Sequence, residues 1–372
     1  MFERSIFTDP PLIHQMSLSK PLPVSAQCAL AGACGLAFGI AFDKSRVFQP
    51  DAIVDQMLMQ RFIMLKMFLA AVGTSAASLG IVSVVAPEKF AAARGKVSGG
   101  KKHLKVAALG AGLLGMGMAL GGACPGMVLA QLGSGVENSV FTLAGCLSGA
   151  LVHALVEPTL TKRFAKSYAK NAKEATFLDK RLLPGVPYAN VALPLAALCG
   201  LAVAGLELAF PWRGEARAVL PRALAGAPMG LQAGMAAIAW PPQAGGAVIG
   251  ALQLPLVLGL GHLLGSSSSY VTVIGCCVPD APGRADLAAK RGPANWWQVA
   301  FVIGGVAGAA LSAVKSNTSG AIKGLHPGLA YAGGISLVLG SRIAGGCTSG
   351  HGISVRMRPA LRAVPPSLTS PW

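Results

Sequence analysis

Eight long apolar stretches constrain this chain more than any other feature of its sequence. About 20 apolar residues in a helix cross the hydrocarbon core of a bilayer, so each stretch predicts a membrane span. Only 12% of the residues are charged, whereas soluble domains carry about 25%. The chain is therefore expected to be an all-α, multi-pass protein of the plasma or inner membrane. The expected spans are about 24–42, 62–86, 106–133, 138–156, 189–210, 243–264, 296–314 and 325–346.

Two further apolar segments complete the expected fold. A ninth span is expected at 223–240, which is rich in Gly and Ala and contains Pro228. The run 266–278 is too short to cross and is expected to be a re-entrant segment buried in protein, because lipid cannot satisfy irregular backbone. The 48 glycines favour close helix packing, since small residues let helices approach in lipid. We therefore expect about nine tightly packed transmembrane helices with short re-entrant half-helices.

The chain contains an internal repeat. Residues 109–124 align without gaps on 332–347, and five of the sixteen positions are identical. The repeat predicts two pseudo-symmetric halves, 24–157 and 189–353, with a binding site at their interface. A basic linker at 158–188 joins the halves, and 1–23 is an N-terminal extension. Residues 354–372 form a Pro- and Arg-rich tail that is expected to add no span. The second half would then be truncated. The identical pairs are Gly110/Gly333, Leu114/Leu337, Gly117/Gly340, Gly122/Gly345 and Cys124/Cys347.

Each copy of the repeat ends in a glycine-rich turn that carries a cysteine. Glycines there break the helix, Pro125 suits the first position of a new helix, and Thr348 or Ser349 suits a helix N-cap. Each cysteine is therefore expected at the mouth of a half-helix, whose free N–H groups favour an anion. The residues expected to bind the permeating ion are Cys124 with Gly122, Pro125 and Gly126, and Cys347 with Gly346, Thr348, Ser349, Gly350 and His351.

The thiols suggest which kind of anion would pass. A neutral thiol offers a weak S–H donor and a polarizable sulfur, which suits an anion with a soft sulfur end. His351 would add a hydrogen bond or exchange a proton. Weaker candidates are Arg342, a cation inside its apolar run, Lys66, whose position near a span end allows snorkelling, and Cys28 and Cys34 in the first span.

The second cysteine turn resembles a known signature. The run Gly346-Cys347-Thr348-Ser349-Gly350-His351-Gly352 is similar to that of the YeeE/YedE sulfur-transport family, which includes thiosulfate importers. The segments Met64–Phe68 and Gly122–Gly126 also resemble that family, and the resemblance covers roughly 26–353. It implies two pseudo-symmetric halves, thiosulfate uptake, and transfer of the ion by the thiols of Cys124 and Cys347. It also implies a small soluble sulfur-carrier protein as a partner on the cytoplasmic side. Some members have a further cysteine soon after Ser-Arg, but here Ser45-Arg46 continues as Val47-Phe48.

The leading hypothesis is therefore a transporter or channel for thiosulfate or a related small sulfur anion, with no cofactor or bound metal. The alternative is a membrane-embedded protein that transfers sulfur through a persulfide on Cys347, which needs a lowered thiol pKa and a resolving partner. A metal-ion pathway through Cys and His is weaker, because acidic ligands are scarce. The net charge of +17 is concentrated between apolar segments. The basic loops 87–105 and 158–188 therefore predict a cytosolic face, and they lack the interleaved aromatics of a nucleic-acid-binding surface.

Overall fold

The computed structural model describes residues 22–95, 104–163, 185–220, 224, 226–265, 267–277 and 292–347. Helices dominate these residues, and the β-pairing within them is a single bridge between Met229 and Ala239. This confirms the expected all-α, multi-pass membrane protein. In the described residues, six helical segments are long and apolar enough to cross a membrane: Val24–Ser45, Ile63–Val85, Ser139–Leu160, Tyr188–Ala209, Pro242–Leu260 and Trp296–Lys315.

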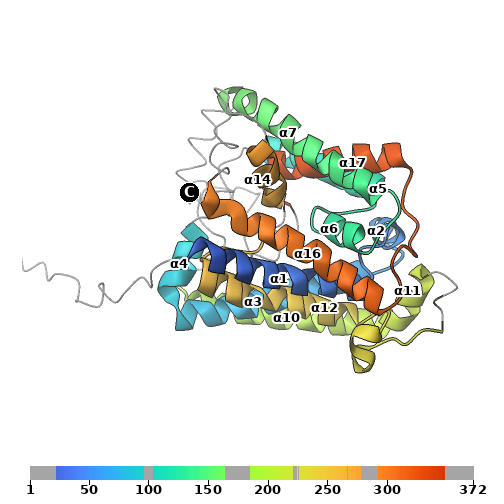
Figure 1. Ribbon diagram of the computed structural model, residues 1–372. Helices are drawn as coiled ribbons and strands as arrows, with labels where there is room; N and C mark the ends of the chain where they lie inside the picture. The colour runs from blue at the N-terminus through green and yellow to red at the C-terminus, as the bar shows by residue number, and fades with distance from the viewer. Residues whose placement is uncertain are drawn as a thin grey trace, which may run out of the picture.

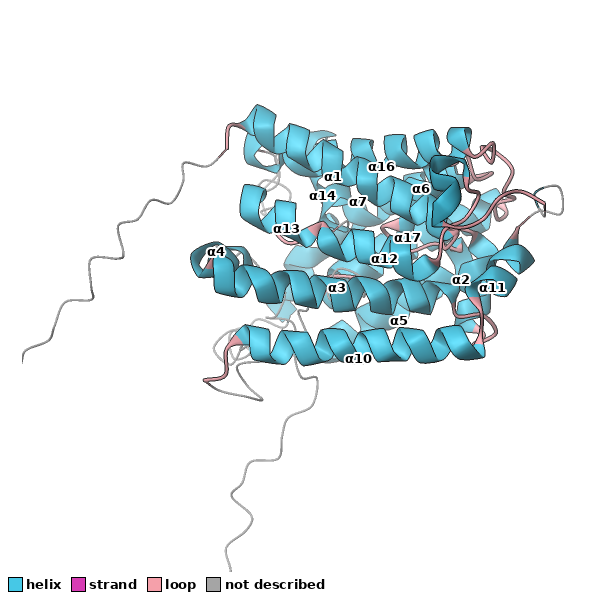
Figure 2. Ribbon diagram, turned by 90° about the horizontal axis from the view of Figure 1, so that it is seen from below, coloured by secondary structure: helices cyan, strands magenta, loops and turns pink. Residues whose placement is uncertain are grey.

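The helices form two rows, one above the other in Figure 1. In the lower row each helix packs against the next, in the order α10 (Tyr188–Ala209), α3 (Ile63–Val85), α12 (Pro242–Ala251), α1 (Val24–Ser45) and α16 (Trp296–Lys315). Figure 2 shows α10, α3, α12 and α1 side by side in that order. In the upper row α17 (Pro327–Ala344) packs against both α5 (Leu104–Gly121) and α7 (Ser139–Arg163). Two short helices, α6 (Met127–Gly133) and α14 (Ser267–Cys277), lie between the rows.

Two helices of the upper row, α5 and α17, are not among the six candidate spans. α5 and α17 have 18 residues each, about 27 Å at 1.5 Å per residue, close to the 30 Å hydrocarbon thickness. Buried residues line the sides of α17 that meet its neighbours, among them Gly333, Leu337 and Gly340. α5 is apolar but just too short to be counted, whereas α17 is shielded by α5 and α7 and needs less lipid-facing apolar surface.

Glycines bring the helices of both rows into backbone contact. A Cβ atom at Gly250 of α12 would lie 2.6 Å from the carbonyl oxygen of Ala71 on α3, and one at Gly39 of α1 would overlap the backbone of α16. A Cβ atom at Gly117 of α5 would lie 2.5 Å from the backbone nitrogen of Leu337 on α17. Only glycine fits at such contacts, which is how small residues drive helix association in lipid.

The contacts between α5 and α17 are reciprocal. A Cβ at Gly110 would lie 2.8 Å from the oxygen of Gly340, and a Cβ at Gly340 would lie 2.8 Å from the oxygen of Gly110. Farther along the pair, a Cβ at Gly117 would lie 3.0 Å from the oxygen of Gly333. The two helices are antiparallel, because later residues of α5 contact earlier residues of α17.

Three expected segments differ from simple spans. The stretch 106–133 breaks after α5 and resumes as α6, as the cysteine turn predicts. The stretch 243–264 continues from α12 through α13 (Gln253–Pro255) into a π-helical turn at Leu256–Leu260. The run 266–278 corresponds to α14, whose 11 residues are too few to cross.

The ninth span expected at 223–240 is wrong. Its described residues, 224 and 226–240, contain a six-residue 3₁₀ helix, Leu231–Ala236, and otherwise extended or turn backbone. Gly230 and Gly234 take positive φ angles of 112° and 54°, which interrupt a helix. The Gly- and Ala-rich composition resembles that of a lipid-facing helix, whereas the oxygens of Met235, Ala237 and Ile238 accept hydrogen bonds from side chains at the end of α1.

The helix ends that flank the two basic loops lie at one end of the bundle. α4 (Pro87–Gly95), the end of α7 and the start of α10 are on the left in Figure 1, and α2 (Pro50–Met57) and α11 (Trp212–Val219) are on the right. The described helix ends that flank the two basic loops therefore lie on one side of the bundle. That this side faces the cytosol stays a prediction.

Candidate functional site

The first cysteine turn leaves α5 through a left-handed glycine. Gly122 has a φ of 51°, and Cys124 follows with 8% of its surface exposed. The backbone N–H groups of Gly126 and Met127, at the start of α6, donate hydrogen bonds to the Cys124 sulfur. The prediction that Cys124 lies at the mouth of a half-helix is therefore matched by the geometry of this turn.

Two side chains from distant elements hold the first turn in place. Gln131 Nε2 on α6 donates to the oxygens of Gly122 and Phe48, each at 2.8 Å. Tyr270 of α14 donates its hydroxyl to the Pro125 oxygen at 2.6 Å. Both partners are buried, and the oxygens of Gly122, Cys124 and Pro125 accept hydrogen bonds although the turn interrupts a membrane segment.

The second cysteine turn leaves α17 in a similar way. Gly345 has a φ of 91° and Gly346 a φ of 151°, values that favour glycine. The N–H groups of Gly345 and Gly346 donate to the oxygens of Arg342 and Ser341, as in a Schellman helix end. Cys347 follows and is 1% exposed.

The two turns bring three thiols and a phenol together inside the protein. Cys146 of α7, Tyr270 and Cys347 belong to one cluster of buried residues, and Cys124 lies near both Cys146 and Cys347. Tyr270 hydrogen-bonds to Cys146 and lies near Cys124 and Cys347. We call Cys124, Cys146, Cys347 and Tyr270 the thiol cluster. Burial in apolar surroundings favours the neutral S–H form of a thiol, so the cluster offers weak donors and polarizable sulfur atoms.

The thiol cluster contains two residues that the sequence interpretation did not assign to the site. Cys146 lies within an apolar span, and nothing in the residues around it distinguishes it from Cys199, which packs against Gly73 of α3. Tyr270 did leave a signal, because it follows four serines in a segment expected to be buried in protein.

The other expected site residues divide into three groups. Gly122, Pro125, Gly126 and Gly346 lie on the two turns beside the thiol cluster. Thr348, Ser349, Gly350 and His351 lie outside the described residues. The weaker candidates Cys28 and Cys34 lie on α1, half-buried and buried, and Arg342 lies in the last turn of α17, half-buried.

Lys66 does not snorkel to the membrane surface, so that reading is wrong. Its side chain is 0% exposed, and its Nζ lies 3.1 Å from Glu207 and 2.6 Å from Glu215. It also donates to the Phe210 oxygen. Paired charges are the usual form in which ionisable groups persist in a membrane protein. This ionic group ties α3 to α10 and α11.

The comparison with known families decides the class of protein. The profile described as sulphur transport matches residues 44–364, which is most of the chain. The chain belongs to the sulphur transport family. The resemblance to the YeeE/YedE proteins is therefore confirmed. A comparison with curated proteins found no match. Membrane-spanning helices and this family together make the chain a sulphur transport protein of the membrane, whose thiol cluster lies within the matched residues.

Proposed function

We propose that this sulphur transport protein passes thiosulfate or a related small sulfur anion across the membrane by way of the thiol cluster. The observation that carries the proposal is the meeting of Cys124 and Cys347 in the interior, each directly after a helix-ending glycine turn. An anion that leaves water needs donors to replace its hydration. The thiols of Cys124 and Cys347 are the donors proposed for this role, because the Tyr270 hydroxyl already donates to Pro125 and the Met127 N–H to the Cys124 oxygen.

The interior position of the cysteines supports permeation rather than surface chemistry. Cys124 and Cys347 are 8% and 1% exposed, so a substrate reaches them only through the protein. A soft sulfur atom in the anion would contact the polarizable thiols, whereas its oxygens would accept hydrogen bonds. This division of contacts distinguishes thiosulfate from sulfate, which has no terminal sulfur.

We also propose that the two halves are pseudo-symmetric repeats with the cluster at their interface. The reciprocal contacts of α5 and α17 support this, because Gly110 aligns with Gly333 and Gly117 with Gly340, and the contacts join each glycine to the partner of the other. An interface related by a two-fold axis has this property. The aligned glycines Gly122 and Gly345 both take positive φ, which is a second correspondence.

Uptake into proteoliposomes tests the proposed function directly. Purified protein would be reconstituted and supplied with ³⁵S-thiosulfate, with sulfate and selenite as competitors. We expect saturable uptake that unlabelled thiosulfate inhibits more strongly than sulfate does. Uptake equal to that of empty liposomes, from protein that is folded by size-exclusion chromatography, would contradict the proposal.

Cysteine variants test the role of the thiols. A hydrogen bond to a charged group is worth about 1.5–3 kcal/mol, so Cys124→Ala and Cys347→Ala should each lower uptake about ten- to a hundredfold. The Ser variants should retain more activity than the Ala variants, because they keep a donor. Cys199→Ala is the matched control, since Cys199 is also a buried thiol (6% exposed) but lies between α10 and α3.

The same variants distinguish transport from persulfide chemistry. Cys146 lies near Cys124, so the cluster contains a thiol that could resolve a persulfide. The cluster is therefore compatible with the sulfur-transfer alternative. An alcohol cannot carry sulfane sulfur, so a persulfide mechanism predicts that Cys347→Ser is as inactive as Cys347→Ala. Near-normal uptake by the Cys124→Ala/Cys347→Ala double variant would contradict both mechanisms.

We further propose that a small soluble sulfur-carrier protein accepts the ion on the cytoplasmic side. The support is the family resemblance and the concentration of basic residues in the loops at one end of the bundle. Pull-down of cytoplasmic proteins with the detergent-solubilised chain, compared with a variant lacking the basic residues of 96–103, would test for such a partner.

A further inference from the structure

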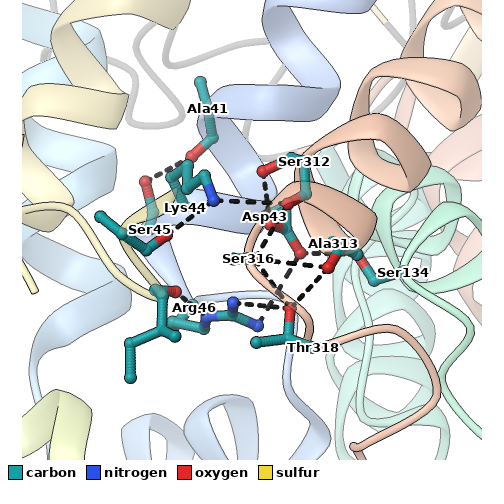
Figure 3. A network of polar contacts seen from close by, with 12 residues as sticks. Ala41, Asp43, Lys44, Ser45, Arg46, Ser134, Ser312, Ala313, Ser316 and Thr318 are labelled. Carbon is teal, nitrogen blue, oxygen red and sulfur yellow. Dashed lines mark hydrogen bonds and ion pairs between the residues drawn. The ribbon is translucent and has the colours of Figure 1, made fainter. Parts of the chain in front are cut away.

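A buried ionic group lies at the end of α1 (Figure 3). Asp43, Lys44 and Arg46 are each 0% exposed. Their formal charges leave one positive charge uncompensated among the three. Burying net charge in a protein interior is unfavourable unless a partner is present, so the hydrogen bonds of each member have to be followed.

Asp43 and Lys44 are satisfied by the protein. Asp43 accepts hydrogen bonds from the hydroxyls of Ser134 (2.8 Å) and Ser312 (2.6 Å). Lys44 Nζ donates to the oxygens of Met235 (2.8 Å), Ala237 (2.7 Å) and Ser312 (3.4 Å). All three donors of the ammonium group are therefore used on neutral carbonyls, so its charge is solvated by dipoles and not cancelled by the carboxylate.

Arg46 retains a free side of its guanidinium group. Its Nε donates to the Ile238 oxygen and its Nη2 donates to the Thr318 hydroxyl at 3.0 Å. Its Nη1 makes no hydrogen bond and is 3.8 Å from the Asp43 carboxylate, beyond hydrogen-bond distance. A buried donor that lacks a partner calls for an explanation, and an absent ion or water is one.

Gln49 adds a second free donor three residues later. Its side chain is 1% exposed, and its Nε2 makes no hydrogen bond. The chain segment from Arg46 to Gln49 thus buries N–H groups of both a cation and an amide without an acceptor. Acceptors with several oxygens and negative charge complement such a set, and a guanidinium fork suits them especially well.

This segment adjoins the first cysteine turn. The Gln131 side chain donates to Phe48, inside the segment, and to Gly122, at the turn. A Cβ atom at Gly122 would lie 2.7 Å from the Cβ of Pro50, so the two backbones are in direct contact. Val47, Phe48 and Cys124 also belong to one buried apolar cluster. The segment that carries the free donors therefore adjoins the turn that carries Cys124, at the end of α1 opposite to α4.

We infer that Arg46 and Gln49 bind a small oxyanion, sulfate or thiosulfate, before it reaches Cys124. The passage of the ion from this site to Cys124 rests on the proposed function, whereas the binding of an oxyanion at the site does not. The site recognises oxygens and charge, so it binds sulfate and thiosulfate alike. Selection for a sulfur end is then left to the thiol cluster.

Isothermal titration calorimetry of the purified full-length protein in detergent tests the site, with sulfate and thiosulfate titrated in a chloride-free gluconate buffer. Gln49→Leu removes the amide donors at similar size and strands no partner, so the variant should fold and bind both anions about tenfold more weakly. Arg46→Lys keeps the charge without the fork and should also bind more weakly. Asp43→Asn raises the net charge of the group by one and should bind more tightly, which a merely structural role does not predict.

Two controls separate this inference from the proposed function. Arg61→Gln changes an arginine that pairs with Asp55 outside this group, and it should bind as the unmodified protein does. Cys124→Ala should lose thiosulfate uptake but keep sulfate binding. Unchanged affinity in both Gln49→Leu and Asp43→Asn overturns the oxyanion site, whatever the transport assays show. Binding that follows the expected order in a protein that fails to take up thiosulfate keeps the site and overturns the transport proposal alone.

Discussion

The close contact between α5 and α17 makes Gly117→Ala an informative substitution. The new Cβ would lie 2.5 Å from the backbone nitrogen of Leu337, whereas ordinary contacts begin at 3.4 Å. A backbone atom cannot rotate away, so the helices would have to separate by about 1 Å, the difference between those distances. Overpacking of this kind destabilises by about 1–3 kcal/mol. Because Cys124 and Cys347 follow these helices, we also expect uptake to fall about tenfold as their donors leave hydrogen-bond distance.

Gly115→Ala is the matched control on the same helix. A Cβ at Gly115 meets nothing within 4 Å, and alanine favours a helix over glycine by up to about 1 kcal/mol. Loss of the monodisperse size-exclusion peak after heating measures stability, and labelled thiosulfate uptake measures function. Gly117→Ala should melt below the unmodified protein, and Gly115→Ala at or above it. Equal melting of the two variants would refute the inferred contact between the helix backbones.

Three other predictions concern the thiol cluster, the ion pairs of Lys66 and the orientation in the membrane. Tyr270→Phe removes the hydrogen bond that holds the first cysteine turn at Pro125, and should lower thiosulfate uptake about tenfold with little change in melting temperature. Lys66→Met leaves the carboxylates of Glu207 and Glu215 without their cation and should destabilise by about 3–5 kcal/mol. Glu207→Gln leaves Lys66 paired with Glu215, so its melting temperature should lie between those of Lys66→Met and the unmodified protein. A membrane-impermeant maleimide applied to intact cells should label Lys323→Cys, at an exposed position, and not a cysteine in 96–103; the reverse pattern contradicts the predicted orientation.

The sequence predicts the spans well where apolar runs face lipid. The expected 62–86, 189–210 and 296–314 match α3, α10 and α16 within one or two residues, because hydropathy reports directly on contact with lipid. The first span was expected to end at residue 42, before three charged residues, yet α1 continues to Ser45. The charges of Asp43 and Lys44 are compatible with this burial because Ser134, Met235 and Ala237 contact them.

The partners of buried charges are what the sequence conceals. Lys44 and Arg46 meet groups about 190 to 270 residues away in the chain, and Lys66 meets Glu207 141 residues away. No local sequence pattern indicates which residues meet across such long separations in the chain. The cysteine turns were predictable because glycine, cysteine and proline act locally on backbone geometry. Cys146 was not, since its role depends on which helix α7 packs against.

The helices of the first half pack mainly against helices that are encoded after residue 188. α1 contacts α16, α3 contacts α10 and α12, and both α5 and α7 contact α17. During synthesis, α1, α3, α5 and α7 leave the ribosome before any of these partners exists. Their glycine faces meet lipid first, and hydrogen-bonded helices tolerate that stage because their backbones are already satisfied. Insertion into the bilayer therefore precedes assembly, and the thiol cluster, which draws on both halves, is completed only when α17 has joined α5 and α7.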